Sequence, residues 1–246
     1  MHLDVGYAQN AILTPVHLTT EMRVDPVVID AAQPVFGWNL KASPIGARNL
    51  RQSGYRIVIA SSAELLARHE GDVWDSGRVS SPLYWQRAYA GAPLNSHTKY
   101  FWQVEVWEGG SSPGRWSRAA HFTTGLLTAG DWSAKWIAAE PDRGPSRQAL
   151  ENRGEMLSAL PPPLPVFRRD FKLRGPVASA LLFVCGLGQY EVRLNGANMT
   201  DTVLNPGWTD YRKTIPTILT TSAACCGPAR MHSACCWAME CITWKA

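Results

Sequence analysis

Five cysteines near the end of the chain have the residue type and the clustering that could carry chemistry. With His232 as a further ligand, their thiolates could in principle hold a zinc ion. Their spacing is CC-x8-CC-x4-C, however, and adjacent cysteines do not form the CxxC knuckle of structural zinc sites. Disulfides would need an oxidising compartment, and the first residues resemble no secretion signal. The five are Cys225, Cys226, Cys235, Cys236 and Cys241.

The carboxylates and histidines show no arrangement typical of acid–base catalysis or metal binding. Each candidate carboxylate falls in an expected strand or turn, where contact with solvent or with the turn backbone is the ordinary role. The six histidines have no metal-ligand spacing, and no helix follows the GLG at 186–188 as a nucleotide-binding loop requires. We therefore assign no catalytic residue, no metal site and no cofactor. The carboxylates considered are Asp72, Asp75, Glu105, Glu108, Glu191 and Asp210.

The composition is that of an ordinary globular protein of one or two domains. The chain has 246 residues, of which 46% are hydrophobic and 18% charged, and these values allow a buried core. The formal net charge is only +4 and no Lys/Arg cluster stands out, so nucleic-acid binding is not implied. No apolar run has membrane-spanning length. The lack of a secretion signal favours a cytoplasmic protein or an incomplete N-terminus.

Residues 13–125 are expected to form a first β-sandwich, after an N-terminal extension at 1–12. Several short alternating strands are separated by turn signals, and this pattern is typical of a sandwich. Residues 62–69 predict a short helix capped by Ser61 or Ser62. Residues 74–77 predict a strand that runs into a turn, and 116–124 the last strand. The residues that alternate most clearly are Phe36, Trp38 and Leu40; Tyr55, Ile57 and Ile59; and Tyr100, Trp102, Val104 and Val106.

Residues 132–216 are expected to form a second, incomplete sandwich. A Pro-rich segment at 139–165 predicts a long surface loop, within which 150–160 could be helical. Strands are expected at 166–171 and 178–184. Tyr190, Val192 and Leu194 then alternate with polar residues in a half-buried strand. Asn195-Gly196 predicts a tight hairpin turn, a second turn is expected at 205–207, and Cys185 is expected to be a buried small hydrophobe.

The exact residues of these segments are more informative than their alternating pattern. The strings GLGQYEVRLNG and LNPGWTDYRK resemble the N-terminal β-sandwich domain of bacterial α-L-rhamnosidases. The strings PVFGWNL, SGYRIVIASS, VWDSGRV, TKYFWQVEVWE and RWSRAAHFTTGLL are similar to the fibronectin type III-like domain that opens those enzymes. The resemblance implies an all-β fold of two consecutive sandwiches, the second like a jelly roll.

The resemblance also implies a function for the longer parent enzyme. Rhamnosidases of this type hydrolyse terminal α-L-rhamnosides with inversion and without an organic cofactor. Their catalytic carboxylates lie on an (α/α)6 barrel that this chain lacks, so we expect it to be inactive alone. The second sandwich of the family is thought to help recognise a rhamnose-containing glycoside, and the aromatic residues to test here are Tyr190, Trp208 and Tyr211. No calcium site is defined, although Asn195, Asp201 or Asp210 could contribute to one.

The amino-acid composition changes after Pro216, where five of the six cysteines of the chain lie. We interpret residues 217–246 as translated out of frame. The family continues with Y-x-T-Y-D-V and later with L-G-x-G-W/M-Y, and this chain has neither. If the codons for residues 234–246 are read one nucleotide earlier, they fit the string LLGNGMY. Residues 217–222 treated in the same way permit YDTYDV. We expect the second sandwich to lack its last strands, to expose a sheet edge and to be poorly stable.

Two other classes of protein stay open. The chain could be a stand-alone carbohydrate-binding or adhesive β-sandwich protein, which affinity of the well-folded chain for rhamnosides would support. It could also be a cysteine-rich metal-binding module, which stoichiometric zinc would support.

Overall fold

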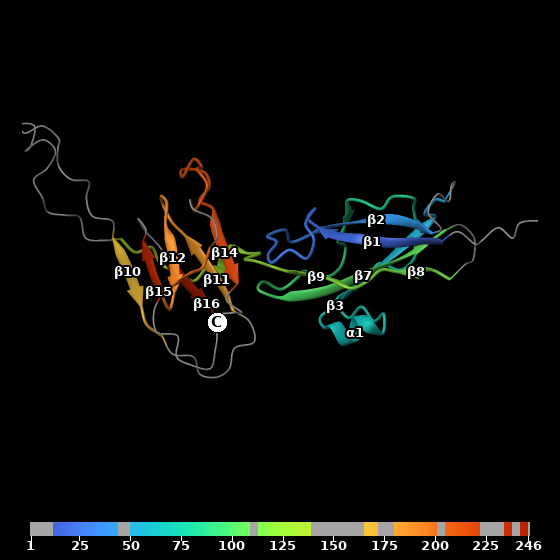
Figure 1. Cartoon of the computed structure of the whole chain (residues 1–246), viewed down its shortest axis with the longest axis horizontal. Coiled ribbons are helices and arrows are strands. Elements are labelled where there is room, and N and C mark those ends of the chain that lie inside the picture. The colour runs from blue at the N-terminus through green and yellow to red at the C-terminus, as the bar shows by residue number, and fades with distance from the viewer. Residues whose placement is uncertain are drawn as a thin grey trace, which may run out of the picture. The chain divides into compact units, whose positions relative to one another are not determined.

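The computed structural model describes residues 12–43, 50–108, 113–138, 165–171, 180–200, 205–221, 234–237 and 242–245. The chain divides into two compact units, Met1–Asp131 and Trp132–Ala246. Both units are built from antiparallel strands, as the sequence pattern predicts (Figure 1).

The first unit is a β-sandwich of two sheets. One sheet has the order β1-β2-β6, and the other has the path β4-β3-β7-β8, with β5 paired to β3 and β9 paired to β7. The strands are β1 (Ile12–Thr20), β2 (Val35–Ser43), β3 (Gly54–Ala60), β4 (Trp74–Asp75), β5 (Val79–Ser80), β6 (Arg87–Ala88), β7 (Lys99–Trp107), β8 (Arg115–Trp116) and β9 (Ala120–Thr123). The return segment expected as one strand at 116–124 is thus divided between β8 and β9.

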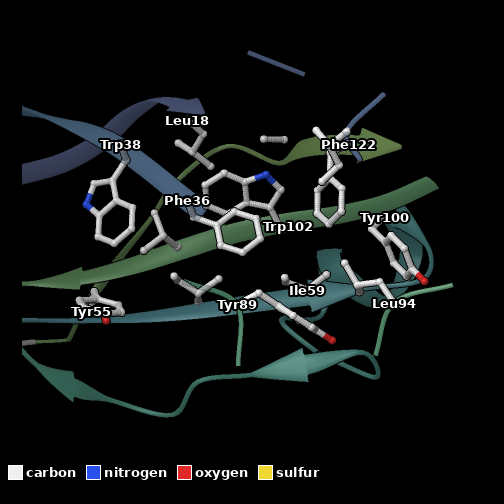
Figure 2. Packing of buried hydrophobic residues seen from close by; sticks show 14 of the residues in the cluster. Leu18, Phe36, Trp38, Tyr55, Ile59, Tyr89, Leu94, Tyr100, Trp102 and Phe122 are labelled. Carbon is white, nitrogen blue, oxygen red and sulfur yellow. The ribbon is translucent and has the colours of Figure 1, made fainter. Parts of the chain in front are cut away.

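Alternation places one side of each long strand in a shared core. Because successive side chains of a strand point to opposite faces, the alternating residues of β2, β3 and β7 all face inward. In Figure 2, Phe36 from one sheet lies against Trp102 from the other, and their ring centroids are 4.7 Å apart. The core cluster includes Leu18, Phe36, Trp38, Tyr55, Ile57, Ile59, Tyr89, Leu94, Tyr100, Trp102, Val104, Val106 and Phe122.

One buried amide ties the two sheets of the first unit together. The indole of Trp38 on β2 donates to Gln52 Oε1 over 3.0 Å. The Gln52 amide in turn donates to the backbone oxygens of Ser81 and Leu83 at 3.1 and 3.0 Å. All hydrogen-bonding atoms of this buried side chain are therefore satisfied, as burial of a polar group requires.

The single α-helix of the described residues covers the outer face of the second sheet. Helix α1 spans Ala63–Ala67, and the Ser62 hydroxyl accepts from the backbone N–H of Leu65 as an N-cap. Leu66 packs with Val58 and Ala60 of β3 in a small cluster of its own. The helix predicted at 62–69 with a serine cap is confirmed.

The second unit is also a β-sandwich in its described parts. Its sheets have the orders β10-β15-β12-β13 and β14-β11-β16. Leu182 and Val184 from one sheet pack against Tyr190 and Val192 from the other. The strands are β10 (Val166–Arg169), β11 (Leu181–Cys185), β12 (Glu191–Leu194), β13 (Ala197–Asn198), β14 (Thr217–Thr221), β15 (Ala234–Trp237) and β16 (Ile242–Lys245). The loop expected at 139–165 and its possible helix at 150–160 lie almost entirely outside the described residues.

The hairpin predicted around Asn195-Gly196 is confirmed. Strands β12 and β13 pair with Arg193 opposite Asn198 and Leu194 opposite Ala197. The φ angles of Asn195 and Gly196 are 50° and 85°. A type I′ turn requires positive φ at both central residues, and Asn and Gly adopt it most readily.

The expectation that the second sandwich lacks strands after Pro216 is wrong, because three segments after Pro216 pair with its sheets. Strand β11 has β14 on one side and β16 on the other, and β15 lies between β10 and β12. The reason lies in the composition of these segments, TILTT, ACCW and ITWK, because β-branched and aromatic residues favour strands in any reading frame. Pairing does not test the frame, so out-of-frame translation stays a hypothesis about the gene.

Candidate functional site

A loop at 205–214 in the second unit carries two of the three aromatic residues predicted to contact sugar. The loop is anchored where it leaves the sandwich, because the Asn205 carbonyl accepts from the backbone N–H of Tyr190 at 2.7 Å. The Asn205 side chain is buried and its amide donates to the Thr200 hydroxyl at 3.0 Å. The Asn205–Pro206 peptide bond is cis.

Asp210 organises the outer part of the same loop. Its backbone carbonyl accepts from the N–H groups of Lys213 and Thr214 at 2.8 and 3.0 Å. Its carboxylate accepts from the backbone N–H and the Nε of Arg212 at 3.2 and 3.1 Å. The Thr209 hydroxyl closes the loop by donating to the Thr214 carbonyl at 2.7 Å. The loop therefore has a conformation fixed by its own hydrogen bonds.

Trp208 projects from this braced loop into solvent. Its side chain is 87% exposed, and Tyr211 is 36% exposed. The side chains of Arg212 and Lys213 beside them are also largely exposed. A flat aromatic ring presented in this way can stack on an apolar sugar face, and the two cations can contact ring hydroxyls or an acidic partner.

Tyr190, the third predicted aromatic, lies in the core instead. Its side chain is 5% exposed, and its hydroxyl donates to the Val184 carbonyl at 2.9 Å. It cannot present a ring face to a ligand, so the prediction of sugar contact is wrong for this residue. The alternation of Tyr190 with Val192 and Leu194 was the sequence signal for burial, since all three are buried.

The carboxylates considered as acid–base candidates are engaged in structural contacts. Asp75 forms a two-pronged pair with Arg56, at 2.9 Å to Nε and 2.5 Å to a terminal nitrogen, and this guanidinium lowers the pKa of Asp75. Asp72 accepts from the backbone N–H and hydroxyl of Ser61 at 2.8 and 2.6 Å. Glu191 pairs with Arg193 on the surface. These contacts agree with the turn and surface roles expected for them.

Burial raises the pKa of Glu105 and of Glu108 in the first unit. Glu105 lies on β7 opposite Arg56 and Trp116 of its neighbouring strands. The Arg56 charge opposes the effect of burial on the pKa of Glu105, so a cation partly balances this carboxylate. A raised pKa with a structural partner is a weak indication of catalysis.

A stacked pair on the outer face of the first unit was not foreseen from the sequence. The His69 ring lies on the Trp116 ring with centroids 4.1 Å apart and 8° between the planes. The Gln103 amide contacts His69 Nδ1 and donates to the Leu66 carbonyl. This side chain network braces α1 against β7 and β8. Its members are far apart in sequence and on different elements, so no local pattern could reveal it.

Metal-binding side chains do not converge in the described parts of the chain. Among those residues, no three His, Cys, Asp or Glu side chains form a potential metal site. Cys185 is buried as expected, and burial raises the pKa of its thiol. Cys225, Cys226, Cys241, His232 and Asp201 lie outside the described residues. Within the described ranges, no helix is long and apolar enough to cross a membrane.

Two family models match the chain, one in each unit. Residues 15–128 match the Rha78A-like, N-terminal immunoglobulin domain. Residues 175–219 match the alpha-L-rhamnosidase N-terminal domain. The chain carries the N-terminal domains of the α-L-rhamnosidase family. The first match names an immunoglobulin domain where the sequence suggests a fibronectin type III-like one, and both describe the same sandwich architecture.

Curated α-L-rhamnosidases are similar over most of this chain. One from Formosa agariphila is 36% identical over 206 residues, which are 82% of this chain and 21% of the relative. One from Streptomyces avermitilis is 36% identical over 193 residues, 74% of this chain and 18% of the relative. The solved α-L-rhamnosidase of Dictyoglumus thermophilum superposes with a TM-score of 0.74 at 26% identity, over 95% of this chain and 25% of that one.

The rhamnosidase match is confined to a small part of the relatives. The chain spans about a fifth of the length of the curated rhamnosidases that it matches. The matched part is their N-terminal region, and both family models describe N-terminal domains.

Proposed function

We propose that this chain is the non-catalytic N-terminal part of an α-L-rhamnosidase whose parent reaction is the inverting hydrolysis of terminal α-L-rhamnosides. The observation that carries the proposal is the order of the two family matches, which fall on the two units in succession. The role of the two sandwiches is to support the catalytic barrel of the parent enzyme and to help it recognise substrate.

The carboxylate chemistry of the first and second units fits a non-catalytic role. Inversion needs one carboxylic acid and one carboxylate about 6.5–9.5 Å apart, with a water molecule between the carboxylate and the sugar. Here Asp75 is held by Arg56, and Asp210 by Arg212 and its own loop. The Arg56 guanidinium lowers the pKa of Asp75, which makes that carboxylate a poor general acid. We expect the purified chain to release no rhamnose from an aryl α-L-rhamnoside, measured by the colour of the freed phenol.

We further propose that Trp208 and Tyr211 contact the rhamnose-containing glycoside. The support is the exposure of both rings on a braced loop, because a fixed loop loses little entropy when it binds. Replacement of one stacking ring should weaken binding about tenfold, which corresponds to about 1.4 kcal/mol.

The test is calorimetric titration of the chain with methyl α-L-rhamnoside. Trp208→Ala should weaken binding, and Trp136→Ala, another exposed tryptophan of the second unit, should leave it unchanged. Equal affinity of the two variants would refute the assignment of Trp208. Binding that is strong in the chain alone would favour the second candidate, a stand-alone carbohydrate-binding protein.

Out-of-frame translation after Pro216 is part of the same proposal. Two points support it: the rhamnosidase domain match ends at residue 219, and residues 217–222 and 234–246 permit codons that would encode both missing family motifs when read one nucleotide earlier. A gene with the frame intact through this point would rule it out.

A further inference from the structure

Three consecutive large apolar residues are exposed on the first unit, and none of the preceding roles uses them. Leu83, Tyr84 and Trp85 expose 43, 42 and 53% of their surface, and we call them the apolar ridge. The ridge immediately precedes β6, the last strand in the order β1-β2-β6. A lone exposed apolar residue is ordinary, but a contiguous group of large ones indicates an interaction site.

The backbone of the ridge is fixed at every residue. The Leu83 carbonyl accepts from the buried Gln52 amide at 3.0 Å, and the Tyr84 carbonyl from the backbone N–H of Trp38 at 2.9 Å. The Trp85 carbonyl accepts from Arg87 Nε at 2.9 Å. The core of the unit therefore holds the ridge in place while its side chains face solvent.

The backbone of the ridge lies in ordinary contact with β2 at Gly37. A Cβ at this glycine would lie 3.7 Å from the Trp85 Cα and 3.8 Å from the Tyr84 carbonyl oxygen. Anchoring of this kind means that the side chains are presented without a large ordering cost on binding. Trp, Tyr and Arg are the residue types that dominate the energetics of protein interfaces, and all three occur between positions 84 and 87.

The chemistry of the ridge suits a protein surface better than a sugar. A sugar site combines aromatic rings with free polar groups that bind hydroxyls. Leu83 instead extends the apolar surface, and the nearby Gln52 amide already donates both of its protons to the Ser81 and Leu83 carbonyls. The ridge therefore offers a largely apolar surface, whose side-chain polar groups are the Tyr84 hydroxyl and the Trp85 indole N–H.

We propose that the apolar ridge is the surface by which the first sandwich packs against the remaining polypeptide of an α-L-rhamnosidase. The occupant follows from the comparisons, because the Formosa agariphila relative continues for about four-fifths of its length outside the region matched here. This inference rests on the proposed function and adds to it the face that makes the contact.

Co-expression tests the ridge with the full 246-residue chain. The chain is produced together with a tagged Formosa agariphila rhamnosidase polypeptide that lacks its own matched N-terminal region, and the amount that copurifies is measured. The triple variant Leu83→Ser, Tyr84→Ser, Trp85→Ser should reduce copurification at least tenfold. The matched control is Met22→Ser, Val24→Ser, Val27→Ser, three exposed apolar residues of the same unit, and it should copurify like the parent chain.

The outcomes separate this inference from the function on which it rests. If the parent chain and the ridge variant copurify equally, the ridge is not the contact and the proposed function stands. If the parent chain does not copurify, the supporting role in a rhamnosidase is contradicted and this inference with it. If the parent chain instead forms dimers by sedimentation that the ridge variant does not form, a second copy is the occupant and the inference is overturned. Unchanged circular dichroism of both variants establishes that they fold.

Discussion

Gln52 is the polar side chain on which the core of the first unit most depends. It connects the indole of Trp38 to the Ser81 and Leu83 carbonyls, and all of these atoms lie in or beside the core. An unpaired buried donor or acceptor costs more than its hydrogen bond contributes when formed. The same amide holds the start of the apolar ridge, so packing and the proposed contact surface share one residue.

Gln52→Ala should lower the free energy of unfolding of the first unit by about 2–3 kcal/mol, because it leaves the Trp38 indole N–H and the Ser81 and Leu83 carbonyls without their hydrogen-bond partner. Urea unfolding followed by circular dichroism measures the change. Arg51→Ala, at the exposed neighbouring position, should shift it by less than about 0.5 kcal/mol. An equal effect of both substitutions would mean that the amide network contributes nothing.

Asp131 should make the stability of the first unit depend on acidity. Hydrogen bonds from Ser96 and from Thr128 lower the pKa of Asp131 from 3.8 to about 2. A depressed carboxylate pKa stabilises the fold above the unfolded pKa, and this contribution is lost as the pH falls through the folded pKa. Asp131→Asn should therefore lower the melting temperature at pH 7, and the difference from the parent should shrink between pH 4 and 2. A difference that is constant over this range would contradict the assignment.

At the scale of single residues, the sequence pattern indicates that Tyr190 is buried but not that Trp208 is exposed. Alternation with Val192 and Leu194 places Tyr190 on the buried face, and the structure agrees. Trp208 follows a turn where no period applies, so its exposure depends on hydrogen bonds within the loop. The ridge could not be foreseen, because the exposure of Leu83 depends on how Gln52 and Trp38 hold its backbone.

The sequence pattern predicted most of the long strands of the molecule, but it did not predict most of the short ones. Strands β2, β3, β7 and β12 follow the alternation of their apolar residues. Two-residue strands such as β5 and β6 contain no full period and exist through pairing with distant neighbours. Strand β1 was missed because Pro15 interrupts its pattern and its register shifts between Val16 and Thr19.

The Asn195-Gly196 turn sets the register of the β12–β13 hairpin. Gly196→Ala should destabilise the second unit by about 1–2 kcal/mol, because its φ of 85° is strained for a residue with a side chain. Gly207→Ala is the control, since a Cβ there meets nothing within 4 Å and its φ is not in the strained range. Thermal unfolding by circular dichroism compares the two. Equal melting temperatures would show that the turn does not control the hairpin.

At the scale of the whole molecule, two sandwiches with separate cores carry the N-terminal domains of a rhamnosidase. Each unit buries its own apolar residues. The strands β14, β15 and β16 complete the sheets of the second unit with segments whose reading frame we question. Their pairing needs only strand-forming composition, whereas the family motifs need a particular sequence.

The measurement that tests the account most directly is sequencing of the gene through the Pro216 codon and well beyond the present stop. We predict that a shift of one nucleotide restores YDTYDV and LLGNGMY and opens a long downstream frame encoding an (α/α)6 barrel. Activity should then be sought in the restored protein. If the frame stands as it is and no barrel follows in any frame, the chain is not part of a rhamnosidase at this locus, and a binding role for its sandwiches is what would be left to test.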